Sequence, residues 1–306
     1  MLHVIINPRS GARGRSLGGA RAALARRLIG QQRIDARVHV TEYPGHAIEL
    51  TREALAQGAN LVCAWGGDGT VNEVATVLAY TGIPLAVVPE GSGNGLAREL
   101  GVYLGPEKAF DVAINGRDRV IDAGQMGDRL FFNLAGIGLD GRIAALFNEQ
   151  APQRRGFFRY IWLGWQQLVT YEPASYRIQI QNERENDRQN EPLELRAIML
   201  VTANLRQYGN GAYIAPLADP EDGRLDLVIV GARSMGRALL LTPRLFTRSL
   251  HQAPNILTKQ VTRVSISSTQ PLVCHADGEP FEAGSTVTVT VKPRALTVRV
   301  PKSLMI

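Results

Sequence analysis

The stretch Gly66-Gly67-Asp68-Gly69-Thr70-Val71-Asn72-Glu73-Val74 decides the fold of this chain. It follows the apolar run 61–65, which has the composition of a buried strand, and it leads into a helical pattern over residues 71–79. Three glycines in four positions let the backbone turn sharply and approach a ligand closely. The helix that follows directs its free N–H groups and its positive dipole end towards the same turn. The stretch therefore predicts a phosphate-binding loop, in which Asp68 is placed to hold a divalent metal ion or to orient a hydroxyl group.

Short apolar runs alternate with helical patterns on both sides of this loop, up to about residue 120. We expect strands at residues 3–6, 37–40, 61–65 and 84–88, and helices at 18–29, 47–57 and 71–79. Such alternation predicts an α/β domain with a doubly wound, mostly parallel sheet covered by helices on both faces. The loops at the carboxyl ends of its strands, residues 7–11, 41–42, 66–70 and 89–94, are expected to meet at one edge.

The pattern changes after about residue 120 and becomes rich in β-strands. The segments 175–181, 195–202, 225–230, 261–267 and 286–291 read as strands separated by turn signals. Helical stretches interrupt them around 141–170 and 235–252, and the polar run 182–191 reads as an exposed hairpin tip. The second half is therefore expected to be mostly antiparallel.

The composition is that of a globular protein with a sizeable core. Of the 306 residues, 45% are hydrophobic and 20% charged, and no run approaches the roughly 20 apolar residues of a membrane span. We expect a cytoplasmic protein without a secretory signal, with Cys63 and Cys274 as reduced, buried thiols. The net charge of +6 suits nucleic acid, an anionic membrane surface or phosphorylated small molecules. No compact Lys/Arg block or interleaved aromatic pattern is present, so nucleic-acid binding is not expected.

Three further clusters have the residues for chemistry. Gly91-Ser92-Gly93-Asn94 again follows a strand and precedes a helix, and it reads as a capping turn or as a second wall of a nucleotide site. Neither glycine loop contains the lysine of a P-loop. Ala276-Asp277-Gly278-Glu279-Pro280 reads as a tight hairpin turn or as the site of a general base, Asp277, supported by Glu279. The acidic stretch 219–226 reads as a site for a hard cation or as a solvated loop.

These motifs resemble, in order and over nearly the whole chain, those of the diacylglycerol kinase catalytic family. This superfamily includes bacterial soluble lipid kinases, sphingosine kinases and ceramide kinases, and the bacterial soluble branch looks most similar. The matching residues are Asn7-Pro8 with Ser10-Gly11, Thr41-Glu42 with 44–47, the block 66–74, the block 91–94 and Asp277-Gly278-Glu279. Ser92 stands where the family often has Thr, and it keeps the hydroxyl group.

The resemblance implies a nucleotide-binding domain over residues 1–120, a β-sandwich that carries the lipid over 121–294, and a last segment, 295–306, that returns to the first domain. It implies that Asp68 holds a catalytic Mg²⁺, and that Asp277 is the general base. A structural Mg²⁺ would be bound by Asp222 and by the backbone carbonyls of Asp219 and Arg224. The residues implied to contact ATP are Asn7, Pro8, Ser10, Gly11, Thr41, Gly66, Gly67, Asp68, Gly69, Thr70, Val71, Asn72, Glu73, Gly91, Ser92, Gly93 and Asn94.

The prediction is an ATP- and Mg²⁺-dependent kinase of phospholipid metabolism, which phosphorylates a hydroxyl group of a diacylglycerol-like or related long-chain lipid. We expect ATP in a cleft between the domains. One alternative is an NAD kinase-like phosphotransferase, since NAD kinases share the Gly-Gly-Asp-Gly-Thr loop. Another is a lipid- or nucleotide-binding regulator without turnover. Which lipid is used is left open, as is a homodimer.

The aromatic window 156–165 is expected to pack in the core as a helix. The alternative is an apolar lip that touches the inner face of a membrane transiently, next to Arg154 and Arg155. A second candidate for such contact is the stretch 239–246.

Overall fold

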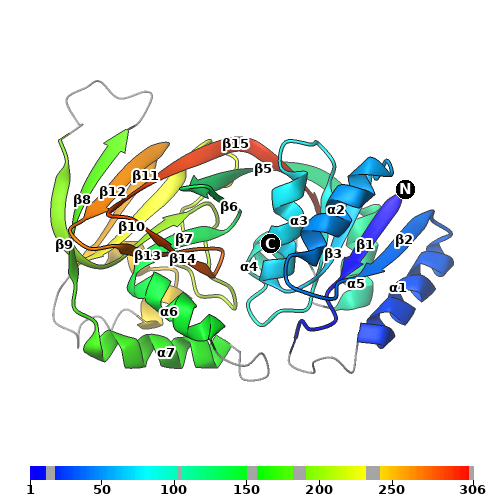
Figure 1. The fold of residues 1–306 in the computed structure, drawn as a ribbon, viewed down its shortest axis with the longest axis horizontal. Coiled ribbons are helices and arrows are strands. Elements are labelled where there is room, and N and C mark those ends of the chain that lie inside the picture. Colours follow the sequence, from blue (N-terminus) through cyan, green and yellow to red (C-terminus); the bar gives the residue numbers. More distant parts are fainter. Residues whose placement is uncertain (12–17, 103–104, 150–156, 182–190, 232–241, 303–306) are drawn as a thin grey trace. The chain divides into compact units, whose positions relative to one another are not determined.

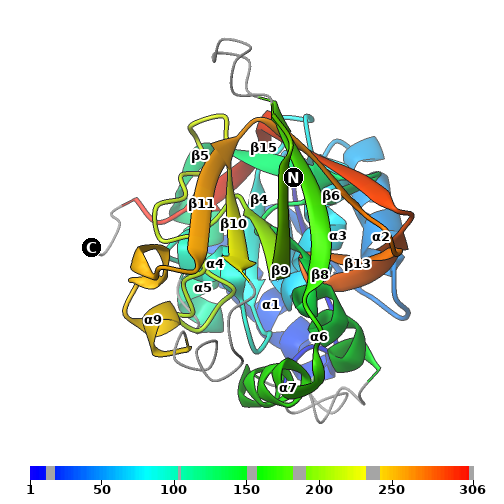
Figure 2. The same ribbon diagram turned by 90° about the vertical axis from the view of Figure 1, so that its left-hand side faces the viewer.

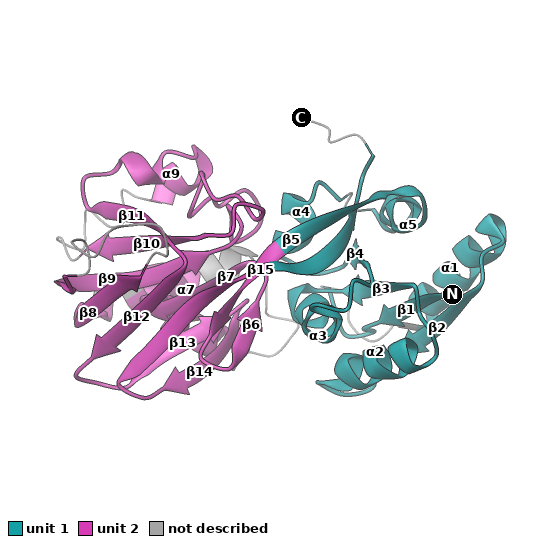
Figure 3. Cartoon of the chain, turned by 90° about the horizontal axis from the view of Figure 1, so that it is seen from above, with its two compact units in different colours: residues 1–121, 152–156, 294–306 teal, residues 122–151, 157–293 magenta. Residues whose placement is uncertain are grey.

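The computed structural model describes residues 1–11, 18–102, 105–149, 157–181, 191–231 and 242–302 (Figure 1). The chain divides into two compact units (Figure 3). Unit 1 contains Met1–Ile121 and the stretch from Arg294 onward, and unit 2 contains Asp122–Ala151 and Phe157–Pro293.

Unit 1 is built on a parallel sheet with the strand order β4-β3-β1-β2. Its strands are β1 (Leu2–Ile6), β2 (Ala36–Val40), β3 (Leu61–Gly66) and β4 (Leu85–Pro89). The connecting helices are α1 (Gly18–Gln32), α2 (His46–Ala56) and α3 (Asp68–Leu78), and α4 (Gly95–Glu99) and α5 (Pro106–Asn115) follow β4. Figure 3 shows α1 and α5 on one side of this sheet and α2 and α3 on the other. Every residue of β1, β3 and β4 is buried, as a parallel sheet covered on both faces requires, so the predicted fold class is confirmed.

The helix after the first glycine loop begins three residues earlier than the sequence predicts. It starts at Asp68, because Gly67 takes an extended conformation (φ −88°, ψ −177°) and acts as the N-cap residue. Asp68, Gly69 and Thr70 therefore form the first helical turn, where a carboxylate is favoured by the positive end of the helix dipole.

Unit 2 is a mostly antiparallel sandwich, as predicted. Its strands are β6 (Arg129–Phe131), β7 (Leu134–Gly138), β8 (Ala174–Gln181), β9 (Leu193–Ala203), β10 (Leu225–Gly231), β11 (Ile256–Val261), β12 (Arg263–Ser268), β13 (Leu272–Ala276) and β14 (Glu279–Ala283). The predicted strand 261–267 is wrong in its boundary, because Val261 ends β11 and the chain turns at Thr262 before β12.

The helices of unit 2 cover one end of this β structure. They are α6 (Leu139–Asn148), α7 (Phe157–Thr170), α9 (Thr242–Phe246) and the short 3₁₀ helix η4 (Leu250–Gln252). Figure 2 shows α7 lying beside α6. The predicted hairpin tip 182–191 lies outside the described residues except for Glu191, as does the predicted helical stretch 235–241.

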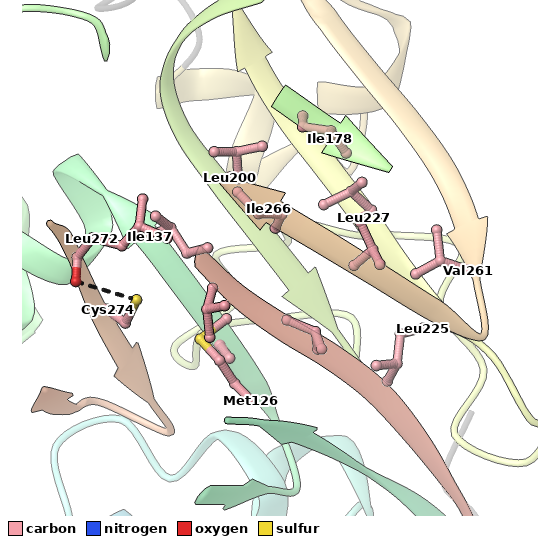
Figure 4. Packing of buried hydrophobic residues seen from close by; sticks show 14 of the residues in the cluster. Met126, Ile137, Ile178, Leu200, Leu225, Leu227, Val261, Ile266, Leu272 and Cys274 are labelled. Carbon is pink, nitrogen blue, oxygen red and sulfur yellow. Dashed lines mark hydrogen bonds between the residues drawn. The ribbon is translucent and has the colours of Figure 1, made fainter. Parts of the chain in front are cut away.

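The core of unit 2 is formed by apolar side chains that alternate along the strands (Figure 4). On β8, Tyr176 and Ile178 are buried while Arg177 and Gln179 are exposed, which is the period of two expected for a half-buried strand. Cys274 lies in this core and Cys63 is buried in unit 1, and both thiols are free, as predicted. Burial raises the pKa of each thiol to about 12, so neither is a ready nucleophile.

Two long strands connect the units along the chain. β5 (Arg117–Met126) leads from unit 1 into unit 2, and β15 (Thr286–Val300) leads back. β15 pairs antiparallel with β12 through Thr286–Thr290 and parallel with β4 through Val298. The sequence predicts a strand at 286–291, and the family resemblance implies a separate last segment, 295–306; the structure instead has one continuous strand over Thr286–Val300.

Candidate functional site

The loops after β1, β2 and β3 are joined by hydrogen bonds at the carboxyl ends of these strands. The amide nitrogen of Asn7 donates to the carbonyl oxygen of Trp65 (2.9 Å), and its side-chain Nδ2 donates to Oγ1 of Thr70 (2.8 Å). The amide of Thr41 donates to the carbonyl of Ile6 at 2.9 Å. The predicted convergence of these loops at one edge is confirmed.

The two glycine loops contact each other through Asp68. Its Oδ2 accepts the N–H group of Asn94 at 2.9 Å, and its Oδ1 accepts the N–H group of Gly95 at 2.8 Å. The backbones touch closely, since a Cβ atom built on Gly67 would lie 3.3 Å from Cα of Gly91. The sequence predicts Asp68 as a metal ligand; the structure adds that its carboxylate ties the two loops together.

The second glycine loop is closed by Asn94, which has a left-handed backbone conformation (φ 52°). Its Oδ1 accepts the N–H group of Gly91, and its Nδ2 donates to the carbonyl of Gly91, both at 2.8 Å. Ser92 is exposed between them. A rigid, glycine-lined backbone at the N-terminus of α3 is an arrangement that suits phosphate groups.

Arg21 and Glu90 join the loop after β1, residues 7–11, to the start of the second glycine loop, and sequence reasoning missed both. Arg21, which is only 6% exposed, donates to the carbonyl oxygens of Asn7 (3.0 Å) and Ser10 (2.8 Å). Its Nη2 lies 3.2 Å from Oε2 of Glu90, whose Oε1 accepts a 3.4 Å hydrogen bond from the indole of Trp65. One arginine inside a helix and one glutamate beside a glycine loop carry no motif, so no local signal points to this pair.

Asp277 lies in the turn between β13 and β14 and is held by three backbone N–H groups. Oδ2 accepts from Phe132 (2.8 Å), and Oδ1 accepts from Asn133 (2.9 Å) and Leu134 (3.0 Å). Asp277 and Gly278 both have positive φ, 48° and 86°, as in a tight hairpin turn. The hairpin interpretation is therefore confirmed, and it places the carboxylate in a fixed orientation.

Glu279 is exposed at the start of β14. Its Oε2 accepts a long hydrogen bond of 3.5 Å from Nδ2 of Asn148, which also donates to the carbonyl of Gly278. The contacts described for Glu279 therefore involve α6 rather than the carboxylate of Asp277.

In the acidic turn, side chains and backbone amides bind one another. Oδ1 of Asp222 accepts the N–H group of Arg224 (2.9 Å), its Oδ2 accepts from Gln260 (3.1 Å), and Oδ1 of Asp219 accepts from Glu221 (3.1 Å). Burial raises the pKa of Asp222, and the negative charges of Asp219 and Asp122 add to this. A carboxylate crowded by others gains from a bound cation.

The side chain of Asp122, which the sequence did not point to, contacts this turn. It is buried on β5, and its Oδ2 accepts the N–H group of Gly223 at 2.8 Å. Burial also raises the pKa of Asp226 to about 6. Asn204 donates to the carbonyl of Asp122, while its own Oδ1 is buried without a hydrogen-bond partner.

Within the described residues, no group of three or more His, Cys, Asp or Glu side chains is arranged to bind a metal, so a cation here would also need carbonyl oxygens.

The aromatic window is divided between core and surface. Leu163 is buried against α6, whereas Trp162 and Trp165 are 52% and 45% exposed. The predicted core packing is thus wrong for the two tryptophans, because a single helix face contacts α6 and they lie on the other side.

The residues 239–241 of the second apolar stretch lie outside the described part, and its Phe246 is 45% exposed. No described helix has the length and apolar character needed to cross a membrane.

Comparisons with known proteins cover nearly the whole chain. Residues 1–126 match the diacylglycerol kinase catalytic domain, and residues 133–300 match the YegS C-terminal NAD kinase beta sandwich-like domain. The chain is 31% identical to a probable lipid kinase YegS-like protein of Klebsiella pneumoniae, covering 90% of this chain and 89% of that protein. It is 30% identical to a diacylglycerol kinase of Mycobacterium tuberculosis, covering 97% and 94%.

Solved structures show the same fold at lower identity. The crystal structure of a diacylglycerol kinase from Bacillus anthracis matches with a TM-score of 0.72 at 19% identity, covering 98% of this chain and 96% of that one. An NAD kinase from Archaeoglobus fulgidus, in complex with ATP, matches with a TM-score of 0.54 at 10% identity, covering 98% and 93%. From its two matched domains and its relatives, this chain belongs to the family of diacylglycerol kinases and YegS-like lipid kinases.

Proposed function

We propose that this member of the lipid kinase family transfers the γ-phosphate of ATP, with Mg²⁺, to a hydroxyl group of a diacylglycerol-like or related long-chain lipid. The observation that carries the proposal is the pair of glycine loops in unit 1. Their backbones touch at Gly67 and Gly91, and the Asp68 carboxylate holds them together. Loops whose conformation is fixed before the ligand arrives lose little conformational entropy when they bind phosphates.

In this proposal the phosphates of ATP are bound by backbone N–H groups rather than by a lysine. The residues that would contact ATP are those predicted from the sequence: Asn7, Pro8, Ser10, Gly11, Thr41, 66–73 and 91–94. Thr70 and Asn7 hydrogen-bond to each other at 2.8 Å and so define one side of this site. The carboxylate oxygens of Asp68 are hard ligands of the kind that Mg²⁺ prefers. Both oxygens of Asp68 already accept N–H groups, so a water molecule between the carboxylate and the cation fits this geometry better than direct contact.

Mg²⁺, when bound, would neutralise charge that develops on the transferred phosphoryl group. We further propose that the acidic turn binds a second, structural Mg²⁺. Asp222 would supply a side-chain oxygen, and Asp219 and Arg224 would supply carbonyl oxygens. The crowding of Asp222 by Asp219 and Asp122 supports this assignment.

Asp277 would accept the proton of the lipid hydroxyl group as it attacks phosphorus. Phosphoryl transfer depends more on positioning than on a strong base. The three N–H groups of residues 132–134 that orient the Asp277 carboxylate are therefore consistent with this role. Glu279 would assist from the neighbouring strand.

A lipid substrate requires access to a membrane surface. We propose transient contact through α7, where Trp162 and Trp165 are exposed side by side along the helix. Tryptophan side chains favour the interfacial region of a bilayer. Loss of vesicle binding in a Trp162→Ala/Trp165→Ala double variant would be the expected result.

The test of the proposed function is a transfer assay with labelled ATP, Mg²⁺ and a panel of acceptors. Diacylglycerol, long-chain alcohols and NAD should be compared, because NAD kinases share the fold. We expect lipid to be labelled and NAD not, and we expect Asp277→Ala to lower turnover by roughly 10²–10⁴-fold. Asp128→Ala, at an exposed carboxylate in the same unit, serves as the control. Activity of Asp277→Ala within a few-fold of wild type would rule out the base, and ATP and lipid binding without product would favour a regulator.

A further inference from the structure

A buried polar cluster lies beneath the turn that carries Asp277. His275 on β13 is 1% exposed and Asp140 in the first turn of α6 is 2% exposed, and Nε2 of His275 lies 2.9 Å from Oδ2 of Asp140. The hydroxyl group of Tyr208 donates to the same Oδ2 at 2.8 Å. The phosphoryl transfer proposed above uses none of these three side chains.

The sheet is shaped to make room for this cluster. His275 pairs with Gly136 of the neighbouring strand β7. A Cβ atom at Gly136 would collide with the Asp140 carboxylate and with the His275 ring. A glycine is therefore needed at this register position, and the contact between His275 and Asp140 depends on it.

The partners of His275 determine where its proton lies. The N–H group of Gly278 donates to Nδ1 at 3.2 Å, so Nδ1 must be unprotonated. The proton of the neutral ring is therefore on Nε2, next to the Asp140 carboxylate. The Nε2–Oδ2 contact is short but not aligned as a hydrogen bond, so the carboxylate stabilises this tautomer mainly by its charge.

The hydrogen bond from Gly278 acts on the backbone of the catalytic turn. Asp277 has a φ of 48°, a conformation that L-residues with a side chain rarely adopt without support. On one side, its carboxylate and its own N–H group bind the segment 132–134. On the other side, the next residue is held by His275. Together these contacts fix both ends of the residue that is to meet the substrate hydroxyl group.

We propose that His275 is a positioning residue for Asp277. Its Nδ1 holds the N–H group of Gly278 and thereby the left-handed turn, while Asp140 and Tyr208 keep the ring in the tautomer that accepts this hydrogen bond. The inference rests on the proposed role of Asp277 as the base, and it assigns a function to a buried group that the reaction itself does not use.

Two substitutions of His275 separate the two ends of the ring. In His275→Asn, the amide oxygen occupies nearly the place of Nδ1 and still accepts from Gly278, but the contact with Asp140 is lost. In His275→Gln, the amide reaches towards Asp140 in place of Nε2, but no acceptor remains for Gly278. Asp140 keeps the hydrogen bond from Tyr208 in both variants, but in His275→Asn the buried carboxylate loses its contact with the side chain at 275. The variant His275→Gln should therefore be the more stable of the two proteins.

Activity is expected to follow the opposite order. We expect His275→Asn to keep kcat within about 3-fold of wild type, and His275→Gln to lower it by roughly 10–10²-fold, the scale of a small misplacement of a catalytic group. The KM for ATP should be unchanged in both, because the turn does not belong to the nucleotide loops. Hydrogen exchange of the peptide that contains Gly278 should be faster in His275→Gln than in His275→Asn.

A purely structural role would make activity follow melting temperature, with His275→Gln the better enzyme, and that result would overturn the inference. Full activity in both variants would do the same. Asp277→Ala distinguishes this from a failure of the proposed function. If Asp277→Ala is inactive while both His275 variants are fully active, the base is retained and only the positioning role is lost. If Asp277→Ala is active, the proposed base itself is wrong.

Discussion

Among single residues, Asp68 has a structural role that is compatible with the chemical role proposed for it. It accepts two backbone N–H groups from the second glycine loop, and it lies in the first turn of α3, where the helix dipole favours its charge. The loops would keep this arrangement without any ligand. The proposed use of Asp68 towards Mg²⁺ then needs little rearrangement when the substrate binds.

The loop-tying role of Asp68 can be measured without activity. In Asp68→Asn, one of the two N–H donors would face an NH₂ group, so one hydrogen bond is lost and one buried donor is left unpaired. We expect a loss of about 1–3 kcal/mol in the free energy of unfolding in the presence of EDTA. Urea unfolding of Asp68→Asn and of the exposed control Asp128→Asn measures this. Equal stability of the two variants in EDTA would leave Asp68 with a metal role only.

Two histidines in unit 1 give its stability a dependence on pH. Nδ1 of buried His3 lies 3.0 Å from Nε2 of His39, and the rings stack. Burial lowers the pKa of both, and for His3 the neighbouring His39 adds to the effect. The unfolded chain therefore binds more protons than the folded chain below about pH 6.5, and stability is lost as the pH falls through this range.

The variant His3→Leu should reduce that loss, since it removes the buried ring that cannot take up a proton. Melting temperatures at pH 7.5 and pH 5.5 measure the effect. We expect a large decrease between the two pH values for wild type and a smaller one for His3→Leu. The same decrease in both proteins would mean that other groups cause the acid sensitivity.

The residues that the sequence predicted and those that it missed differ in one physical respect. Asp68, Asn94 and Asp277 lie in turns whose glycines and neighbours already indicate an unusual backbone. Arg21, Asp122 and His275 lie inside regular elements, and their roles come from partners distant in the chain, such as Glu90 for Arg21. A single sequence contains no record of which distant residues meet, so only the folded structure could identify these three.

Among the elements, the first half of the chain was predictable because strictly alternating strands and helices leave few topologies. The strand order of unit 2 was not. β7 pairs with β13, about 140 residues later, and with β9, and no turn signal connects them. The predicted helix 18–29 is present as α1, but it extends to Gln32, because Gly30 does not end the helix in spite of its low helix propensity.

Gly30 offers a stabilising substitution in α1. It has open space around its Cα and no positive φ, so Gly30→Ala should add about 0.5–1 kcal/mol to the free energy of unfolding. Gly45 is the matched control. It also faces open space, but its φ of 85° makes an alanine strained, so Gly45→Ala should destabilise. Thermal unfolding of both variants decides the point, and equal shifts in the same direction would contradict this account.

The contact between α1 and the glycine loops should affect nucleotide binding. In Arg21→Lys, one ammonium group cannot reach the carbonyls of Asn7 and Ser10 and the carboxylate of Glu90 together. We expect the KM for ATP to rise about 10-fold, equivalent to 1.4 kcal/mol, with a smaller effect on kcat. Arg27→Lys, at an exposed position on the same helix, should leave both constants unchanged. A lower kcat with an unchanged KM would show that Arg21 does not act through the ATP loops.

For the whole molecule, the end of the chain is part of the first unit. Ala295, Leu296, Val298 and Val300 are buried, and the amide of Tyr80 donates to the carbonyl of Ala295 at 2.7 Å. Arg299 adds a 2.7 Å ion pair with Asp118. The matched catalytic domain, residues 1–126, therefore lacks a strand that its own sheet uses.

A fragment of residues 1–126 should accordingly be much less stable than the same fragment joined by a Gly/Ser linker to residues 294–302. Three of the buried side chains, those of Leu296, Val298 and Val300, contribute about 1.5–3 kcal/mol each, a large part of the stability of a small domain. We expect a cooperative thermal transition only in the joined protein, followed by circular dichroism. A joined protein with Val298→Asp is the control, because it keeps the length and linker but places a charge in the sheet. A fragment 1–126 that unfolds cooperatively at the same temperature as the joined protein would show that unit 1 folds without its last strand.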